Sequence, residues 1–356
     1  MIKVEINLSA IRRNILKMKA KLKPGTKFCP VLKANGYRFG DDKVAPAIED
    51  IVDYFGCFHI TELERLRNAG ITKPILLLGV CEDFGRAIKN KATITITSVF
   101  EAKALAKFAG ENKLNCPIHI EVDTGMERFG IATIDELKEI LDIAGKSKFI
   151  DITGLFTHFA YATTENKDMV DAQIRAFKPF ATMLKKKYQN AIIHAASSGT
   201  AEYSDAQFDM VRGGFFIYGS LVDGYENCLK ATSNIVAIRH VKAGTKIGYS
   251  GTKTVDKDTT IGLVAAGYAD VINFKLFATA PLFVNDKPCY VLGRICMDSC
   301  MIDVSHIKDP LGKTVTVYDN KPSMTLLDRG NENGHTGSLI LALDFNRADV
   351  TYITDK

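Results

Sequence analysis

The chain has 356 residues, of which 46% are hydrophobic and 24% charged, and its formal net charge at pH 7 is +5. This length exceeds what one hydrophobic core usually serves, so we expect two domains. The basic residues are dispersed, and the one dense run, Lys185-Lys186-Lys187, follows an amphipathic stretch where cations favour a helix C-terminus. Nucleic-acid binding is therefore not expected.

The eight cysteines are scattered and form no Cys-x-x-Cys pair, which is typical of buried thiols in a reducing compartment. Cys296 and Cys300 have a metal-like spacing, but no histidine or second cysteine pair stands beside them, so no metal site is expected. Residues 1–6 lack the apolar core of a signal peptide, and no apolar run approaches a membrane-spanning length. We predict a cytoplasmic protein without membrane contact.

Short apolar runs alternate with helix-like stretches over the first two-thirds of the chain. The predicted strands are Phe28–Lys33, Asp53–Phe58, Ile75–Leu78, Ala92–Thr97, Ile118–Asp123, Ile150–Phe156, Ala191–Ala195 and Asp209–Arg212. The predicted helices include Thr61–Asn68, Phe100–Ala109, Ile134–Ala144 and Asp168–Tyr188, and Thr133 with Glu136 has the spacing of a capping box. Strand alternating with helix implies parallel pairing, so residues 1–222 are predicted to form a (β/α)8 TIM barrel. An open doubly wound sheet is the alternative, although no Gly-x-Gly-x-x-Gly follows the first strand.

The pattern changes near residue 225. The later apolar segments are β-rich and separated by turn residues: Ala231–Val241, Thr259–Ala266, Leu282–Val284, Ser299–Val304 and Thr314–Tyr318. Helical spacing is scarce until Leu339–Asp344, and residues 331–335 are polar and loop-like. We therefore predict a mostly β domain over residues 223–356, into which an N-terminal strand at residues 2–6 is a candidate to pair.

In a parallel barrel, reactive groups belong on the loops after the strands. Lys33 ends the first predicted strand, where desolvation would lower the pKa of its amine and make it nucleophilic. On the fifth strand, alternation puts His119, Glu121 and Asp123 on the face opposite the aliphatic residues, so they should point into the barrel. Charges there need partners, and Arg128 in the next loop is the nearest candidate.

The remaining strand ends suggest an anion site. His158 follows the sixth strand, Ser198 lies in a small-residue segment after the seventh, and Gly213-Gly214 follows Arg212 on the eighth. Phosphate often binds after the last two strands of such barrels. A lysine, a histidine and a phosphate cradle together suggest a phosphorylated carbonyl cofactor, for which pyridoxal phosphate fits best. Taken one at a time, each of these residues also has an ordinary structural explanation.

Seven segments in order along both domains resemble the alanine racemase family. They are Val31–Tyr37, Asp123–Arg128, Gly154–Ala160, Phe208–Gly219, Ile247–Gly251, Gly267–Asp270 and Val291–Asp298. The resemblance implies an alanine racemase that interconverts L- and D-alanine by a two-base mechanism on pyridoxal phosphate and supplies D-alanine for peptidoglycan. It also implies a homodimer with active sites shared between subunits.

The resemblance assigns roles to residues. Lys33 would hold the cofactor and act as one base, and Tyr249 from the partner subunit would be the other. Tyr37, Ser198, Gly214 and Phe215 would bind the cofactor phosphate, His158 would pack on its ring, and Arg212 would face the ring nitrogen. Arg128 and the backbone of Met297 would bind the substrate carboxylate, with Glu121 and Tyr268 in support.

The chain departs from the family at two of these places. Many members have a lysine that becomes carbamylated where this chain has Glu121, and we hypothesise that the glutamate carboxylate replaces the carbamate as the anion that holds Arg128. The family's C-terminal phosphate-binding tyrosine has no clear counterpart, since counting back from Arg347 gives Ser338, and Tyr352 is a weaker candidate.

Other functions stay open at this point. One is a racemase of broader small-amino-acid specificity, including serine. A barrel-type amino-acid decarboxylase shares the cofactor and both domains, but it expects an acidic residue in place of Arg212 and a cysteine in place of Tyr249. A non-catalytic pyridoxal phosphate carrier would need only the barrel, and a purely structural barrel would leave Lys33 unmodified.

Overall fold

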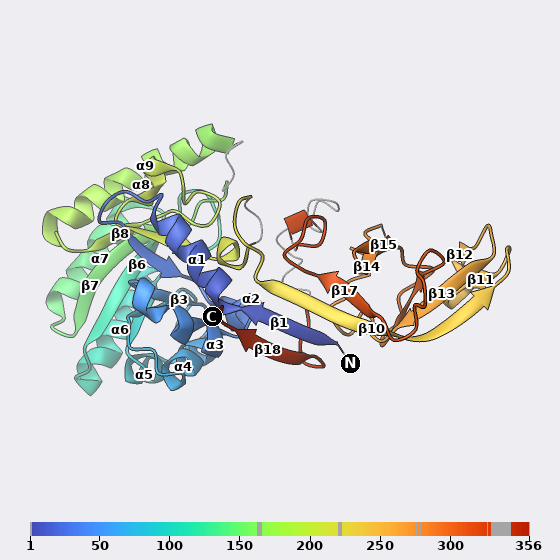
Figure 1. Cartoon of the computed structure of the whole chain (residues 1–356). Coiled ribbons are helices and arrows are strands. Elements are labelled where there is room, and N and C mark those ends of the chain that lie inside the picture. The colour runs from blue at the N-terminus through green and yellow to red at the C-terminus, as the bar shows by residue number, and fades with distance from the viewer. Residues whose placement is uncertain are drawn as a thin grey trace. The chain divides into compact units, whose positions relative to one another are not determined.

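The computed structural model describes residues 2–161, 166–219, 223–274, 276–277, 279–325, 327–328 and 343–355. They fall into two compact units, one formed by Ile15–Ile217 and the other by Met1–Asn14 together with Tyr218–Lys356 (Figure 1).

A parallel eight-stranded sheet forms the core of the first unit. Its strands are β2 (Lys27–Pro30), β3 (Phe55–Cys57), β4 (Ile75–Leu77), β5 (Ala92–Ile96), β6 (Cys116–Val122), β7 (Ile150–Thr157), β8 (Ile192–His194) and β9 (Met210–Gly213). They pair in the order β2-β9-β8-β7-β6-β5-β4-β3. The two outer strands also meet, because Val31 bridges Gly56 and the N–H of Leu32 donates to the carbonyl of Gly56 at 2.7 Å. The sheet is thus a nearly closed barrel, and the predicted fold class is confirmed.

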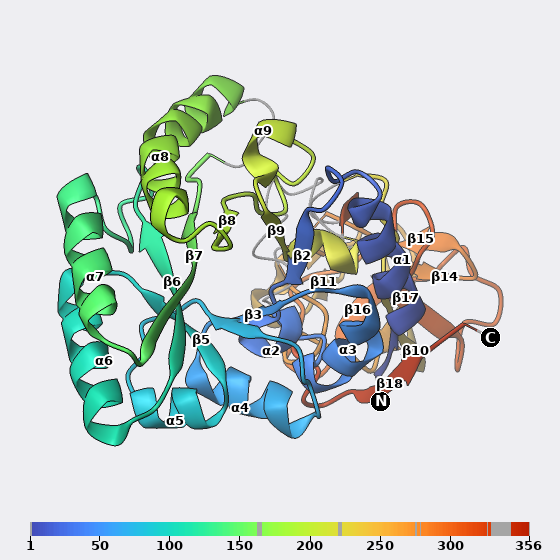
Figure 2. The same cartoon turned by 90° about the vertical axis from the view of Figure 1, so that its left-hand side faces the viewer.

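Helical segments connect the strands of this sheet, and the longer ones cover its outside. They are α1 (Leu8–Lys19), which begins in the second unit, α2 (Lys33–Tyr37), α3 (Asp41–Ile48), α4 (Ile60–Asn68), α5 (Phe84–Lys89), α6 (Val99–Asn112), α7 (Ile134–Lys146), α8 (Lys167–Lys187) and α9 (Ser204–Gln207), with a 3-10 turn η1 (Glu49–Ile51). Figure 2 shows α6, α7 and α8 lying outside β6 and β7.

Helix α7 illustrates how the sequence makes one of these helices. The N–H of Glu136 donates to the hydroxyl of Thr133 at 3.2 Å, and the Glu136 carboxylate accepts the N–H of Thr133 at 2.9 Å, so the predicted capping box is present. Leu137, Ile140 and Leu141 are buried, which is the spacing of a single apolar helix face against the sheet.

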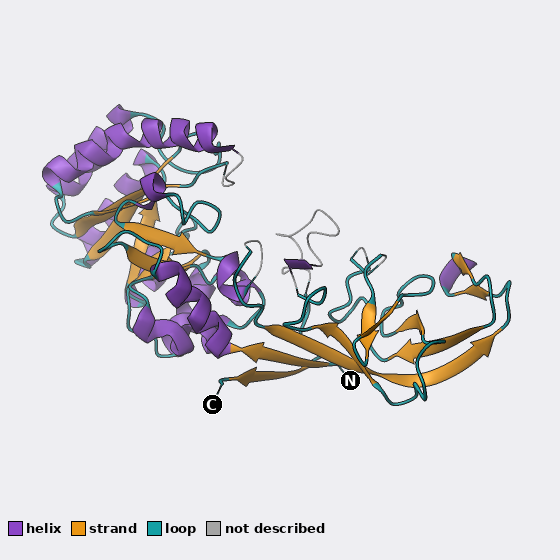
Figure 3. Ribbon diagram, turned by 45° about the horizontal axis from the view of Figure 1, so that its top comes forward, coloured by secondary structure: helices purple, strands orange, loops and turns teal. Residues whose placement is uncertain are grey.

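The second unit is built mostly of strands, as predicted (Figure 3). They are β1 (Lys3–Asn7), β10 (Leu229–Val241), β11 (Lys246–Ile247), β12 (Lys253–Thr254), β13 (Thr259–Val264), β14 (Leu282–Val284), β15 (Lys287–Cys289), β16 (Cys300–Asp303), β17 (Thr314–Tyr318) and β18 (Asp349–Ile353). Short 3-10 turns are η3 (Phe215–Tyr218), which straddles the boundary between the units, and η4 (Tyr249–Gly251).

The long strand β10 organises this unit. It pairs antiparallel with β1, β13 and β17, and β1 pairs in parallel with β18. Strand β18 was not predicted, and it contains Tyr352, which lies opposite Ile6. The predicted loop at 331–335, Ser338 and residues 339–342 of the predicted helical segment lie outside the described residues. No helix within the described ranges is both long enough and apolar enough to cross a membrane.

Candidate active site

Lys33 begins a left-handed turn at the end of the barrel strands. We predicted that its strand would continue to Lys33, but β2 ends at Pro30 and α2 follows. The backbone of Ala34, Asn35 and Gly36 is left-handed, with φ values of 52°, 57° and 60°. A left-handed conformation costs a residue other than glycine about 1–2 kcal/mol, so neighbouring structure must stabilise this turn. The turn presents Lys33 beside the barrel mouth.

The amine of Lys33 is partly buried in an environment that favours its neutral form. Burial lowers its pKa below the usual value, the positive charge of Arg128 lowers it further, and the negative charge of Glu62 opposes them. The amine also lies 6.0 Å from the centre of the Tyr37 ring. A neutral amine is a nucleophile and a proton acceptor, which suits a lysine that reacts with a carbonyl group.

Four of the predicted cofactor residues gather into one cradle. The rings of Tyr37 and Phe215 pack with centroids 4.5 Å apart, and the N–H of Gly214 donates to the hydroxyl of Ser198 at 2.8 Å. A Cβ atom on Gly214 would lie 2.7 Å from the Tyr37 hydroxyl, so only glycine lets this phenol approach the backbone. Burial raises the pKa of Tyr37, which keeps its phenol neutral. The cradle therefore offers the hydroxyls of Tyr37, after β2, and Ser198, after β8, beside the backbone that follows β9.

Arg212 on β9 is buried and fixed by several acceptors. Its Nη2 donates to the carbonyls of Thr157 and Ala195 at 2.8 and 3.1 Å, and it lies 3.4 Å from Nδ1 of His158. Its Nη1 donates to Nδ1 of His194 at 2.6 Å. Burial lowers the pKa of Arg212 to about 10, so the guanidinium is still charged at neutral pH.

Two buried histidines continue this network inward. Because arginine only donates, His194 must accept at Nδ1 and carry its proton on Nε2, which donates to Nδ1 of His119 at 2.9 Å. His119 then carries its proton on Nε2, and this atom has no hydrogen-bond partner among the described residues. Burial and the charge of Arg212 lower the pKa of His119 to about 3 and that of His194 well below 6.5. Both rings are therefore neutral at pH 7.

The positive charges of three predicted site residues act on the imidazole of His158. Burial, together with the charges of Arg212, Arg128 and Lys33, lowers its pKa to about 3. All three cations thus act on one imidazole, which stays neutral. The network of His194 and His119 was not predicted, although alternation had placed His119 inside the barrel, because spacing gives a side chain's direction and not its partner.

The two acidic residues at the C-terminal end of β6, Glu121 within the strand and Asp123 just after it, have separate roles. Asp123, which we expected to point into the barrel, instead accepts the backbone N–H groups of Gly125, Met126 and Arg128 at 2.7, 2.9 and 3.0 Å. It shapes the loop that carries Arg128. Glu121 is buried, and burial raises its pKa to about 7 although Arg212 and Arg128 act against this rise.

The second unit carries the other predicted residues. Tyr249 lies in η4 and is 66% exposed, while Tyr268 and Met297 are 45% and 52% exposed. The N–H of Tyr268 donates to the carbonyl of Cys296, and that of Ala269 to the carbonyl of Met297, both at 3.0 Å. This pairing brings the segments of Tyr268 and Met297 together. Arg347, which we had not assigned a role, lies 2.7 Å from the Asp298 carboxylate and 3.7 Å from that of Asp270.

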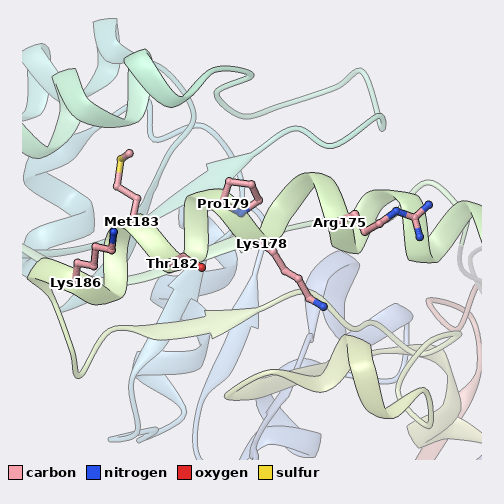
Figure 4. A pocket seen from close by; sticks show the side chains of 6 residues that line it. All are labelled: Arg175, Lys178, Pro179, Thr182, Met183 and Lys186. Carbon is pink, nitrogen blue, oxygen red and sulfur yellow. The ribbon is translucent and has the colours of Figure 1, made fainter.

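A pocket elsewhere carries no part of this chemistry. The side chains that line it all come from α8: Arg175, Lys178, Pro179, Thr182, Met183 and Lys186 (Figure 4). They belong to the outer helical layer, and none of them follows a barrel strand. We therefore do not assign the pocket to the reaction.

Family models match almost the whole chain. The model described as alanine racemase, N-terminal domain, matches residues 6–222, and the one described as alanine racemase, C-terminal domain, matches residues 228–341. The chain belongs to the alanine racemase family. It is therefore an amino-acid racemase.

Individual members of the alanine racemase family are similar over most of their length. The alanine racemase of Desulforamulus reducens is 35% identical over 322 residues, which are 86% of this chain and 86% of that protein. The one from Methanococcus maripaludis is 32% identical and covers 93% of this chain and 92% of its own. The alanine racemase structure from E. faecalis is 28% identical with a TM-score of 0.91, over 99% of this chain and 98% of that one.

Proposed function

We propose that this chain interconverts L- and D-alanine, with Lys33 and Tyr249 as two bases on opposite faces of the substrate Cα. The observation that carries the proposal is the partly buried position of the Lys33 amine on the turn that also bears Tyr37, where burial and the charge of Arg128 lower the pKa of the amine. Racemisation removes a proton on one face and returns one on the other, so one base alone does not suffice. Membership of the alanine racemase family supports alanine as the substrate.

Pyridoxal phosphate is the cofactor that we propose for the barrel. The neutral phenol of Tyr37, the hydroxyl of Ser198 and the backbone at Gly214 and Phe215 form a donor-rich cradle that suits a phosphate group. Lys33 would supply the amine that reacts with the carbonyl carbon of this cofactor. When bound, this cofactor supplies the electron sink for negative charge at the substrate Cα.

Arg212 would hold the cofactor ring without protonating it. A guanidinium that is still charged at neutral pH donates hydrogen bonds but does not release its proton to a ring nitrogen. The carbonyls of Thr157 and Ala195 and the ring of His194 fix its plane. Neutral His158 would pack against the ring. An unprotonated cofactor ring would withdraw electrons less strongly than a protonated one. This would limit side reactions that follow from too much stabilisation of negative charge at Cα.

Tyr249 would come from a second copy of the chain, in a homodimer with shared sites. Its large exposed fraction, and those of Tyr268 and Met297, support a surface that a partner covers. An ordinary tyrosine pKa is near about 10, so the phenol needs nearby positive charge to act as a base. Arg128 would provide this charge and would also bind the substrate carboxylate together with the backbone of Met297.

Glu121 would act as the anion that holds Arg128. Because its pKa is raised to about 7, the carboxylate gains a proton and loses its charge as the pH falls through 7. The KM for L-alanine should therefore rise below pH 7. In Glu121→Gln the KM should be about tenfold above the wild-type value at pH 8, equivalent to about 1.4 kcal/mol, and independent of pH between 6 and 8, because the amide has no negative charge to attract Arg128.

Steady-state kinetics at several pH values test the role of Glu121. The control is Glu139→Gln, which removes the same charge from an exposed side chain on α7, far from the site. Added bicarbonate should change neither the wild type nor Glu121→Gln. Recovery of activity by bicarbonate, or an unchanged KM in Glu121→Gln, would contradict the role.

Two alternatives fit less well. A barrel-type decarboxylase expects an acidic residue where Arg212 lies and a cysteine where Tyr249 lies. Activity on serine or other small amino acids depends on pocket volume, so the assay below includes serine.

The eight free cysteines among the described residues support a cytoplasmic location, where D-alanine would be made for peptidoglycan.

The deciding experiment incubates L-alanine with the cofactor-loaded protein in D2O. We expect D-alanine to appear with deuterium at Cα and no amine product. Ethylamine and carbon dioxide would indicate a decarboxylase, and L-alanine recovered without deuterium would exclude the proposed activity. A parallel incubation with L-serine measures the substrate range.

A further inference from the structure

The turn after β2 is unusual because several of its residues other than glycine adopt the left-handed conformation. Besides Gly36, residues Ala34, Asn35, Tyr37 and Arg38 have φ values of 52°, 57°, 56° and 78°. Such a conformation persists only where surrounding groups over-determine it. The turn bears both the reactive amine of Lys33 and the phenol of Tyr37, so whatever stabilises it also positions these two groups.

Glu62, in the first turn of α4, bonds directly to this turn. It is 6% exposed, and its Oε1 accepts the backbone N–H of Ala34 at 2.6 Å. Its Oε2 accepts the N–H groups of Phe58 and His59 at 2.8 and 3.1 Å. The bonds to Phe58 and His59 belong to the capping of α4. The bond to Ala34 does not, and it ties the turn to a different barrel segment.

We propose that Glu62 is a positioning residue: its buried carboxylate fixes the left-handed turn at Ala34 and so orients the Lys33 amine and the Tyr37 phenol. The inference rests on the proposed function for its effect on the reaction. The charge of Glu62 also acts on Lys33, which faces Arg128, Glu62, the Tyr37 ring and His158. Glu62 raises the pKa of the amine against burial and Arg128.

The variant Glu62→Gln keeps the size of the side chain, but it removes the charge and one of the two acceptor oxygens. We expect kcat to fall about 10- to 100-fold while KM for L-alanine stays within about twofold, because the reacting amine is misplaced and Arg128 is not. The acid limb of the kcat profile should move to lower pH, since the Lys33 pKa loses a group that raises it. Backbone amides of residues 33–38 should exchange with D2O faster, a change that does not depend on activity.

A matched control is Glu49→Gln. Glu49 also accepts backbone N–H groups of another segment, those of Thr72 and Lys73, at 2.7 and 3.0 Å. This variant should lower Tm without changing the pH profile or the exchange of residues 33–38. Ala34→Gly in the Glu62→Gln background should restore much of kcat, because glycine adopts the left-handed conformation without a steric cost.

The outcomes are distinguishable. Unchanged exchange of residues 33–38 in Glu62→Gln would overturn the inference, and so would a kcat loss without a shift of the pH profile. Should Glu62→Gln not fold, the same comparison is made between Ala34→Gly alone and the double variant. Should the wild type show no racemisation, the exchange data still decide whether Glu62 fixes the turn, and the proposed function fails separately.

Discussion

Replacing Lys33 by alanine is expected to lower kcat for alanine racemisation by about 1,000-fold or more. The substitution removes both the amine that would bind the cofactor carbonyl and one of the two bases, and a positioned acid–base group alone contributes about 10²- to 10⁴-fold. The partly buried site and the lowered pKa of this amine suit both roles. The measurement is the rate of D-alanine formation from L-alanine in the purified, cofactor-saturated variant.

A second readout identifies the bond itself. Borohydride reduction of the wild-type holoenzyme should attach the cofactor covalently to the peptide that contains Lys33. The visible absorbance band of the lysine-bound cofactor should be absent in Lys33→Ala. The control is Lys27→Ala, which changes an exposed lysine on β2, the strand that precedes Lys33. Racemisation by Lys33→Ala within tenfold of the wild-type rate would contradict the assignment, as would attachment of the cofactor to another lysine.

Replacing Tyr249 by phenylalanine should reduce kcat/KM for racemisation by about 10²- to 10⁴-fold in both directions, whereas exchange of the Cα hydrogen should fall unequally for the two enantiomers. Only the base on one face of Cα is lost. One enantiomer should therefore keep exchanging its Cα hydrogen with D2O through Lys33, while the other exchanges far more slowly. NMR of L- and D-alanine in D2O measures both exchanges, with Tyr188→Phe at the end of α8 as the control. Small and equal losses of Cα hydrogen exchange for the two enantiomers would argue against two bases.

Mixing the two variants tests whether the site is shared. In a dimer of one Lys33→Ala chain and one Tyr249→Phe chain, one site has both bases and the other has neither. After random exchange of subunits, half of the dimers are mixed, so activity should recover to about a quarter of the wild-type value. Bases that act within one chain would give no recovery.

Much of the barrel could be predicted because its signals are local. Each predicted strand lies within a few residues of the observed one, and the capping box at Thr133 lies at the predicted helix start. The gathering of Arg212, His158 and the cradle at Gly214 follows from a general rule about strand ends in parallel barrels. Family motifs then linked each residue to a role, and all of these roles remain predictions.

The features that escaped prediction depend on contacts between distant segments. The left-handed turn after Pro30 needs a carboxylate from α4, and nothing in the residues around Lys33 indicates Glu62. Asp123 satisfies the N–H groups of its own loop, although alternation had directed it inward. Strand β18 is recognisable only by its pairing with β1, at the opposite end of the chain.

The buried file of Arg212, His194 and His119 has a consequence for where protons can travel. Each member points its hydrogen inward, beginning from a guanidinium that does not give its own away and ending at a nitrogen with no neighbour to receive one among the described residues. A hydrogen-bonded chain of this kind does not relay protons. The proposed proton exchange at the substrate Cα would then use groups at the ends of the barrel strands, such as Lys33, and the buried chain would serve only to fix the orientation of Arg212.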